Sequence, residues 1–372
     1  MAVYKIFPEK DTFIFSDIPT GNAGKDEITE IGGYSDVFGT GQTNRILIKY
    51  DTEDIQGVLT SLVGTNSYSA SLHIYLADAY QIPVNYNLYA YPVAASTDWD
   101  AGVGKYGDIP TDTSGVSWTF INAGQQNAWL TNSFPTGVTG SFNSGVPGGG
   151  TWYTGSNGIN LESVQPHVLN SSNDVDIDVT PAIKLFISGT IQNQGFILKL
   201  PSTLEFNTTS SIRLKYYGSN TNTIYPPSLD IKWDDSTYNT GSLSILSTSQ
   251  ATIQISNNTG KYVDEGKQRF RLATKPTFPP RTFTTSSSYL VNYALPSGSY
   301  WGVRDENTEE MIIDFDSSFT KISCDPTGPF FDIYMDGLQP ERYYRILVKT
   351  VLDGSTTVVD NSNIFKVVRI GQ

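Results

Sequence analysis

The chain has 372 residues, and its 24 Lys and Arg against 37 Asp and Glu give a net charge of −13. This negative charge argues against sequence-independent binding to nucleic acid or to an anionic membrane. A hydrophobic fraction of 38% argues against intrinsic disorder, and the single cysteine, Cys324, excludes an internal disulfide and a zinc site built from cysteines. The length is sufficient for two or three domains.

Short apolar runs separated by Gly, Pro, Asn and Asp recur along the chain, and this pattern is typical of strands rather than long helices. Residues 45–50 (RILIKY) predict a buried strand, and the apolar spacing over 55–62 predicts one or two helical turns after it. Residues 71–79 alternate in polarity and predict a strand, as do residues 86–93. The first part of the chain is therefore predicted to be all-β.

Residues 96–160 are the least regular part and combine four tryptophans with many glycines, as long loops crossing a sheet would. After them, Val175, Ile177 and Val179 alternate with three aspartates, which predicts a strand with one solvent-facing side. Thr180 and Gly189 then have the character of an N-cap and a C-terminal cap of a short helix. Further strands are predicted in 194–200, 210–218 and 228–233.

The polar stretch 234–242 predicts a domain boundary, so the domains are expected to be 1–234 and 235–372. Strand signals resume about every ten residues, which favours a β-sandwich. They lie at 243–246, 251–255, 288–295, 309–315, 330–335, 343–351 and 365–370. Leu338, Pro340 and Tyr344 match the L-x-P-x-x-x-Y signature of fibronectin-like sandwiches, in which the tyrosine bonds back to nearby backbone.

Ordered segments in the first 233 residues resemble the DNRLRE domain, a jelly-roll module related to carbohydrate-binding modules. The segments are DTFIFSDIPTGNAGKDEITEI, NRILIKYD, SASLHIYLADAY, DWDAGVGKY with SGVSW, DVDIDVTPAIKLFISGTIQNQGFILKL and SLDIKW. Gln42, Thr43, Asn44 and Arg45 match the hallmark hexapeptide of that family only in part. The resemblance implies a jelly-roll fold for about residues 10–233. It supports this fold more strongly than it supports any ligand site.

The chain as a whole resembles virion structural proteins of large tailed phages, particularly those of cyanobacteria and other aquatic bacteria. The resemblance rests on MAVYKIFPEKDT, IRLKYYGSNTNTIYPPSLDIKWDDSTY and KISCDPTGPFFDIYMDGLQPERYYRILVKTV. It implies a non-enzymatic component of a phage particle, located in the virion and made in the host cytoplasm. The position of the protein on the particle (tail, baseplate, neck or head surface) stays open.

Aromatic residues concentrated in the irregular region are candidates for an interface or a ligand surface. They are Trp99, Tyr106, Trp118, Trp129, Trp152 and Tyr153. Aromatic faces on loops stack on sugar rings or anchor protein interfaces. Large aromatics are also common in cores, so core packing, a protein interface and sugar binding are all open readings.

Asp98 and Asp100 flank Trp99 on a predicted loop, and sandwich modules of the carbohydrate-binding type often bind calcium at such places. Calcium is therefore the one candidate ion, and no other cofactor is expected. Paired carboxylates also perform glycoside hydrolysis when one has a raised pKa, but no local signature supports this here. Neither histidine lies near a catalytic motif, and Cys324 is expected to be a small buried residue, so no catalytic residue is assigned.

The leading hypothesis from the sequence is an all-β assembly protein of a phage particle, with a jelly-roll domain followed by a fibronectin-like sandwich. Its expected partners are other virion proteins and copies of itself, with a docking part within 235–285. The alternative is a carbohydrate-binding adhesion module that contacts a cell-surface glycan. A glycosidase-type enzyme is the third hypothesis.

Overall fold

The computed structural model describes residues 2–35, 41–140, 147–209, 211–278 and 291–370. The chain divides into two compact units, each formed by segments that are separate in the sequence. The larger unit comprises residues 6–62 and 69–230, and the smaller unit comprises residues 1–5, 63–68 and 231–372. The sequence analysis assigned 1–234 to one domain, whereas here the first five residues group with the C-terminal unit.

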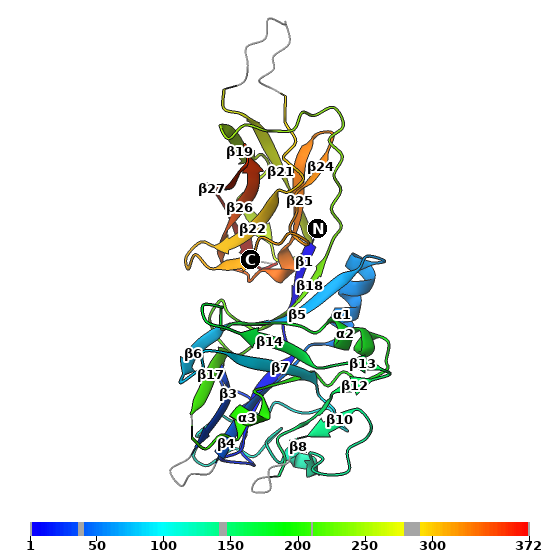
Figure 1. The fold of residues 1–372 in the computed structure, drawn as a ribbon, viewed down its shortest axis with the longest axis vertical. Helices are drawn as coiled ribbons and strands as arrows, with labels where there is room; N and C mark the ends of the chain where they lie inside the picture. The colour runs from blue at the N-terminus through cyan, green and yellow to red at the C-terminus, as the bar shows by residue number, and fades with distance from the viewer. Residues whose placement is uncertain (1, 36–40, 141–146, 210, 279–290, 371–372) are drawn as a thin grey trace, which may run out of the picture. The chain divides into compact units, whose positions relative to one another are not determined.

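An antiparallel sheet in the order β14-β7-β16-β4-β3-β17-β6 forms the body of the larger unit, and β2 also pairs with β4 (Figure 1). Its strands are β2 (Lys10–Phe15), β3 (Ile28–Ser35), β4 (Gly41–Lys49), β6 (Leu76–Tyr80), β7 (Tyr86–Pro92), β14 (Ser163–His167), β16 (Phe196–Lys199) and β17 (Ile212–Tyr217). Strand β4 is buried at seven consecutive positions; the apolar residues 46–48 predict the last three, whereas the first four are polar or charged.

A second sheet has the order β1-β18-β5-β15. These strands are β1 (Ala2–Ile6), β5 (Tyr68–Ile74), β15 (Val175–Asp178) and β18 (Ser228–Trp233). Strand β15 alternates between buried and exposed positions, as predicted. The single strand expected over 71–79 is instead two strands that belong to different sheets, because the chain leaves β5 at Ile74 and enters β6 at Leu76.

Short helices connect the strands of the larger unit. Helix α1 (Thr52–Val58) continues into a π-helical turn, η1 (Leu59–Val63), and the Asp51 carboxylate accepts the Glu53 backbone N–H at its start. Helix α2 (Thr180–Ile187) is N-capped by Val179 rather than by the predicted Thr180. The Thr180 hydroxyl instead accepts the Ala70 backbone N–H at 2.8 Å, and α3 (Ser202–Glu205) follows β16.

Between β7 and β14 the chain forms only short strands and turns, in agreement with its irregular sequence. They are β8 (Phe120–Asn122), η2 (Ala123–Gln125), β9 (Asn127–Ala128), β10 (Val138–Gly140), β11 (Thr151–Tyr153), β12 (Gly155–Ser156) and β13 (Ile159–Asn160). This region carries the aromatic residues that the sequence analysis singled out.

Two sheets, β19-β21-β25-β24 and β20-β27-β26-β22-β23, form the smaller unit. Their strands are β19 (Ala251–Ile255), β20 (Lys261–Val263), β21 (Lys267–Pro276), β22 (Tyr300–Asp305), β23 (Met311–Ile313), β24 (Ser323–Asp325), β25 (Gly328–Tyr334), β26 (Tyr343–Leu352) and β27 (Ser355–Val368); η4 (Met335–Gly337) follows β25. Phe270 and Phe331 from the first sheet pack on Trp301 and Phe365 from the second, so the core lies between the sheets.

The L-x-P-x-x-x-Y signature of the smaller unit predicts a hydrogen bond from its tyrosine to nearby backbone, and the structure contains this bond. The Tyr344 hydroxyl donates to the Gln339 backbone oxygen at 2.9 Å, and both Leu338 and Tyr344 are buried. Burial raises the pKa of Tyr344, so this hydroxyl stays protonated and can donate.

The all-β sandwich prediction is confirmed, and two of its details are wrong. Residues 243–246 and the described part of 288–295 are not strands, because they make only one isolated bridge, between Ile245 and Ala294. Residues 288–290 lie outside the described part of the chain. Conversely, β21 and β22 are strands that the sequence analysis did not name. None of the helices in the described ranges is long and apolar enough to cross a membrane.

Candidate interface

The four tryptophans proposed as ligand or interface residues lie in the core of the larger unit. Trp99, Trp118, Trp129 and Trp152 are between 0% and 6% exposed, and they pack with β-strand residues such as Leu47 and Ile197. The indole N–H of Trp99 donates to the Gln194 carbonyl at 2.9 Å, and that of Trp129 donates to the Ser117 carbonyl at 2.9 Å. Of the three readings that the sequence left open, core packing is the one that this burial fits, because no indole face is open to a sugar or a partner.

The two tyrosine candidates are more accessible than the tryptophans. Tyr106 is 45% exposed, packs edge-on against Phe15, and donates its hydroxyl to Asp17 at 2.6 Å. Burial together with the Asp17 carboxylate raises the pKa of Tyr106 to about 12. Tyr153 lies half-buried on β11, opposite Val138. The structure therefore does not combine the six aromatic candidates into one exposed surface.

The Asp98 carboxylate, proposed as a calcium ligand, binds two lysines. Lys10 donates to one of its oxygens at 2.8 Å and Lys49 to the other at 3.0 Å. Burial raises the pKa of Asp98, but these two bonds outweigh it and lower the pKa below its ordinary value. A glycosidase acid needs the opposite shift. Asp100 instead accepts the Gly102 backbone N–H at 3.0 Å.

The calcium expectation for Asp98 and Asp100 stays a prediction in the part of the chain that the structure describes. Among those residues, no three His, Cys, Asp or Glu side chains are grouped as a metal site requires. The calcium expectation for Asp98 and Asp100 therefore has no support in the geometry, because the ammonium groups of Lys10 and Lys49 take the positions of a cation.

A buried ion cluster occupies the position of the partly matching hallmark motif. The Arg45 guanidinium donates through Nε and Nη2 to the two oxygens of Glu205, both at 2.8 Å, and Lys199 donates to Glu205 at 3.0 Å. Arg45 also donates to the Gly149 carbonyl and lies over the Trp118 ring at 5.1 Å. Arg45 and Glu205 are fully buried, so the cluster joins β4, α3 and the loop that contains Gly149 inside the larger unit.

Sequence reasoning did not find Glu205 as the partner of Arg45, because the two residues are 160 positions apart. The available signal was an arginine beside an unbroken apolar run and a glutamate within the largely apolar segment LEF. Charged residues at such places need a partner, but the sequence does not say which one. This cluster holds the fold together and offers no exposed group to a ligand.

A row of cations lies on β21 of the smaller unit. Strand β21 alternates, so Phe270 and Leu272 enter the core while Lys267, Arg269 and Arg271 lie on the outer face, and Lys275 follows in the same alternation. We call these four residues the cation ladder. The ladder lies within the segment 235–285 that the sequence analysis proposed for docking, of which residues 279–285 are outside the described part.

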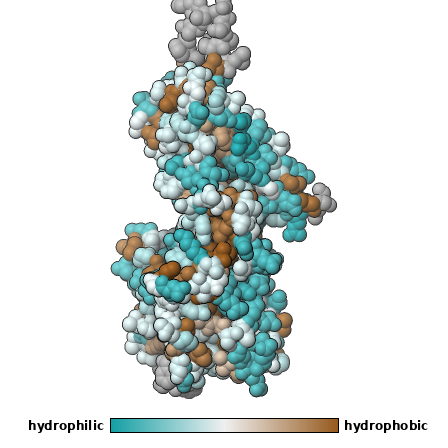
Figure 2. Space-filling view, turned by 90° about the vertical axis from the view of Figure 1, so that its right-hand side faces the viewer, coloured by the Kyte–Doolittle hydropathy of each residue, from teal (hydrophilic) through white to brown (hydrophobic). Residues whose placement is uncertain are grey.

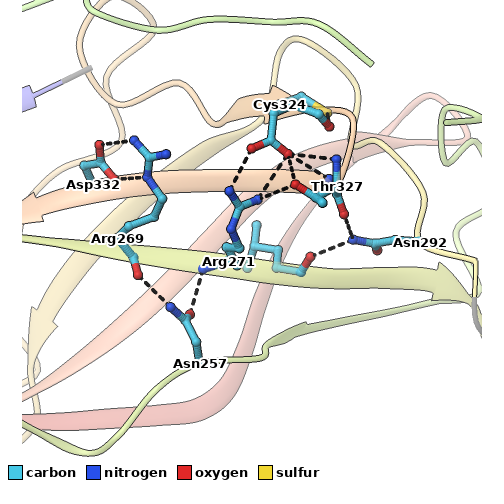
Figure 3. A network of polar contacts seen from close by, with 10 residues as sticks. Asn257, Arg269, Arg271, Asn292, Cys324, Thr327 and Asp332 are labelled. Atoms are coloured by element: carbon cyan, nitrogen blue, oxygen red, sulfur yellow. Dashed lines mark hydrogen bonds and ion pairs between the residues drawn. The ribbon is translucent and has the colours of Figure 1, made fainter. Parts of the chain in front are cut away.

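Ion pairs hold the two arginines of the cation ladder (Figure 3), and both guanidinium groups also lie near the Phe330 ring. Arg269 donates twice to Asp332, at 2.8 and 2.9 Å, and lies over the Phe330 ring at 4.1 Å. Arg271 donates twice to Asp325, at 3.1 and 2.8 Å. The hydrogen bond from Arg271 lowers the pKa of Asp325, so this carboxylate stays ionised at neutral pH.

Amide side chains fix the backbone around the cation ladder. Asn257 donates to the Arg269 carbonyl at 2.7 Å and accepts the Arg271 backbone N–H at 2.8 Å. Asn292 donates to the carbonyls of Leu272 and Thr327, which ties the loop before β25 to β21 (Figure 3). The cations are thus presented from a braced sheet, while the Lys267 and Arg269 side chains remain 44% and 46% exposed.

A hollow of about 320 Å³ lies on the larger unit, along the paired strands β6 and β17. Its lining residues are Asp78, Tyr80, Ser211, Arg213 and Lys215. Tyr80 is 57% exposed, and the Arg213 guanidinium is held 4.0 Å from the centre of the Tyr34 ring. An exposed aromatic ring beside hydroxyl, carboxylate and guanidinium groups can stack on a ring-shaped ligand and bond to its hydroxyls.

Hydrophilic residues cover much of the face drawn in Figure 2, with apolar residues in smaller groups between them. Comparison with known proteins adds no family to this picture, because neither protein-family models nor curated proteins match the chain.

Proposed function

We propose that this protein is a non-enzymatic structural component of a tailed-phage virion that assembles through protein–protein interfaces. The observation that carries the proposal is the cation ladder, a braced and exposed row of positive charges on a chain whose net charge is −13. Such a surface is complementary to acidic partners, and copies of this chain are acidic. The assignment to a virion rests on the resemblance of the sequence to phage structural proteins.

Burial of surface is the proposed mechanism of action. Specific interfaces typically remove about 1,200–2,000 Å² from water, and the outer faces of two sandwich units offer broad sheet surfaces for this purpose. Charge complementarity steers encounter and sets the register, while apolar residues at the centre contribute most of the affinity. A negative net charge keeps the free chain soluble before assembly.

Peptide mass spectrometry of gradient-purified particles tests this function. We expect peptides of the chain to sediment with the particles at a constant copy number across the peak fractions, after a high-salt wash. Hundreds of copies indicate a head-surface position, and a few copies indicate a neck or baseplate position. Finding the chain only in the soluble fraction, together with turnover of a substrate by the purified protein, would overturn the proposal.

Carbohydrate binding is the second candidate function, and the hollow along β6 and β17 favours it. The test is a glycan array probed with the wild-type chain and with Tyr80→Ala, with Tyr343→Ala as a control because Tyr343 is similarly exposed on the other unit. Saturable binding that disappears only in Tyr80→Ala supports this candidate. Binding that is absent or equal in all three proteins refutes a sugar site in the hollow.

A further inference from the structure

We infer that the cation ladder of one copy docks onto the outward carboxylates of strand β15 in a second copy of this chain. This inference rests on the proposed assembly function, and it names the partner of that interface. The residues that carry it are Lys267, Arg269, Arg271 and Lys275 on β21, and Asp176 and Asp178 on β15.

The ladder has more positive charge than its own sheet neutralises. It has four cations, and three of them, Lys267, Arg269 and Arg271, form ion pairs with only two carboxylates, Asp332 and Asp325. Arg269 uses Nε and Nη2 for Asp332, which leaves further N–H groups of a half-exposed guanidinium to donate outward. The ladder can therefore accept an additional row of carboxylates without losing its internal pairs.

Strand β15 presents such a row at the same repeat. Val175 and Ile177 are buried, whereas Asp176 and Asp178 are exposed on the opposite side of the strand. The strand lies at the end of its sheet order, next to β5. Alternate residues of any strand are about 6.6 Å apart, so cations on β21 and carboxylates on β15 have commensurate spacing.

The charges select a head-to-tail contact between copies. Two ladders placed face to face would oppose like charges, and so would two β15 rows, so a symmetric pairing of either surface is disfavoured. Ladder against β15 joins opposite charges, and because each copy carries both surfaces, the contact can repeat from copy to copy.

Apolar residues near both rows can supply the burial that surface ion pairs lack. Exposed ion pairs contribute little affinity each, so a docking surface also needs apolar anchors. Phe278, two residues after the end of β21, is 76% exposed, and Leu169, before β15, is 68% exposed. An antiparallel alignment of β21 with β15 brings these two ends of the rows together.

Charge reversal tests the contact directly. The ladder variant carries Lys267→Glu and Lys275→Glu, and the carboxylate variant carries Asp176→Lys and Asp178→Lys. In sedimentation velocity at low salt we expect the wild type to associate with increasing concentration, and each variant alone to associate at least tenfold more weakly. An equimolar mixture of the two variants should regain association, because each then offers the surface that complements the other.

The mixture separates specific docking from general attraction. Each pair of substitutions changes the net charge by four from −13, so both variants stay negative and repel one another overall. The control variant carries Lys25→Glu and Lys261→Glu, which make the same charge change as the ladder variant at exposed positions elsewhere. This control should associate at least as strongly as the equimolar mixture of the ladder and carboxylate variants. Circular dichroism identifies any variant that does not fold, and the salt dependence of the wild type then serves as the second measurement.

The outcomes distinguish this inference from the proposed function. A wild type that stays monomeric at all concentrations, association that is insensitive to salt, or folded variants whose mixture does not associate would each overturn the docking of β21 on β15. If particles nevertheless contain the chain, its virion function stands without this contact. If the mixture associates but particles lack the chain, the contact stands and the virion assignment fails.

Discussion

Arg45 with Glu205 in the larger unit and Arg271 with Asp325 in the smaller unit are the same chemical pair in opposite surroundings. Each guanidinium donates two bonds to both oxygens of one carboxylate, and the shortest is 2.8 Å in each pair. The side chains of the first pair are 1% and 0% exposed, and those of the second are 35% and 29% exposed. Geometry alone therefore does not distinguish the two pairs, but burial does.

The difference shows what each ion pair contributes. Removing one partner of a buried pair leaves a charge that has lost its water and has no counterion, so breaking the pair strongly destabilises the fold. Water replaces a lost partner at the surface, so an exposed pair stabilises little and mainly orients its arginine. The buried cluster thus supports the packing of the larger unit, while the ion pairs of the cation ladder orient exposed positive groups.

The largest effect is expected from Glu205→Gln. Arg45 and Lys199 would then share no carboxylate in a buried site, and we expect the free energy of unfolding to fall by about 3–5 kcal/mol. Urea unfolding followed by tryptophan fluorescence measures this change. Replacing the whole cluster, as Arg45→Met with Lys199→Met and Glu205→Leu, should recover part of the loss, and a loss below about 1 kcal/mol for Glu205→Gln would contradict the assigned role of the cluster.

Gly149→Ala should disrupt the same cluster, because the Gly149 carbonyl accepts a hydrogen bond from Arg45. Gly149 has a φ of +87°, and a Cβ there would lie 2.6 Å from the Trp118 ring and 2.9 Å from Arg45 Nη1. Backbone strain of this kind costs about 1–3 kcal/mol, and the clash adds to it. The matched control is Gly158→Ala, which has a φ of +77° and open space around the Cβ, so thermal unfolding should show a smaller loss for it. Equal losses would refute the clash.

Tyr344→Phe tests a neutral buried bond in the smaller unit. The substitution removes the hydroxyl that donates to the Gln339 carbonyl and leaves that carbonyl without this donor. We expect the free energy of unfolding to fall by about 0.5–1.5 kcal/mol. Tyr343→Phe changes an exposed hydroxyl next to it and should leave the unfolding midpoint unchanged in the same denaturant titration.

Asp325→Asn should have the smallest effect and is the direct counterpart of Glu205→Gln. The exposed pair predicts a loss of about 0.2–1 kcal/mol at neutral pH. Because the Arg271 bond lowers the pKa of Asp325 in the folded state, the stabilisation is present above the unfolded pKa of about 3.9 and is lost as the pH falls through the folded pKa. Unfolding curves of wild type and variant should therefore converge on acidification, and a gap that widens at low pH would contradict the pairing.

Periodicity predicted most of the strands but not the partners of their charged residues. Alternation at Val175, Ile177 and their neighbours, and the signature ending at Tyr344, were readable because the pattern involves residues close in sequence. The sequence left the role of the aromatic candidates open because an indole on a loop has the same sequence signal whether it faces solvent or core, and here Trp99 and Trp118 face the core. No local pattern indicated that Lys10 on β2 and Lys49 on β4 bind Asp98, and calcium binding there stays a prediction.

The sequence by itself determined that this protein is an acidic, all-β chain with a tyrosine corner, since composition and strand alternation are local properties. Only the tertiary structure decided which charges are buried, which are paired and which remain outward. Arg45 and Glu205 lie 160 positions apart, and Arg271 and Asp325 lie 54 apart, so their pairing depends on how strands distant in the chain come together. Burial then makes the first pair the more important one for stability, because the free energy of an unpaired charge depends on its access to water.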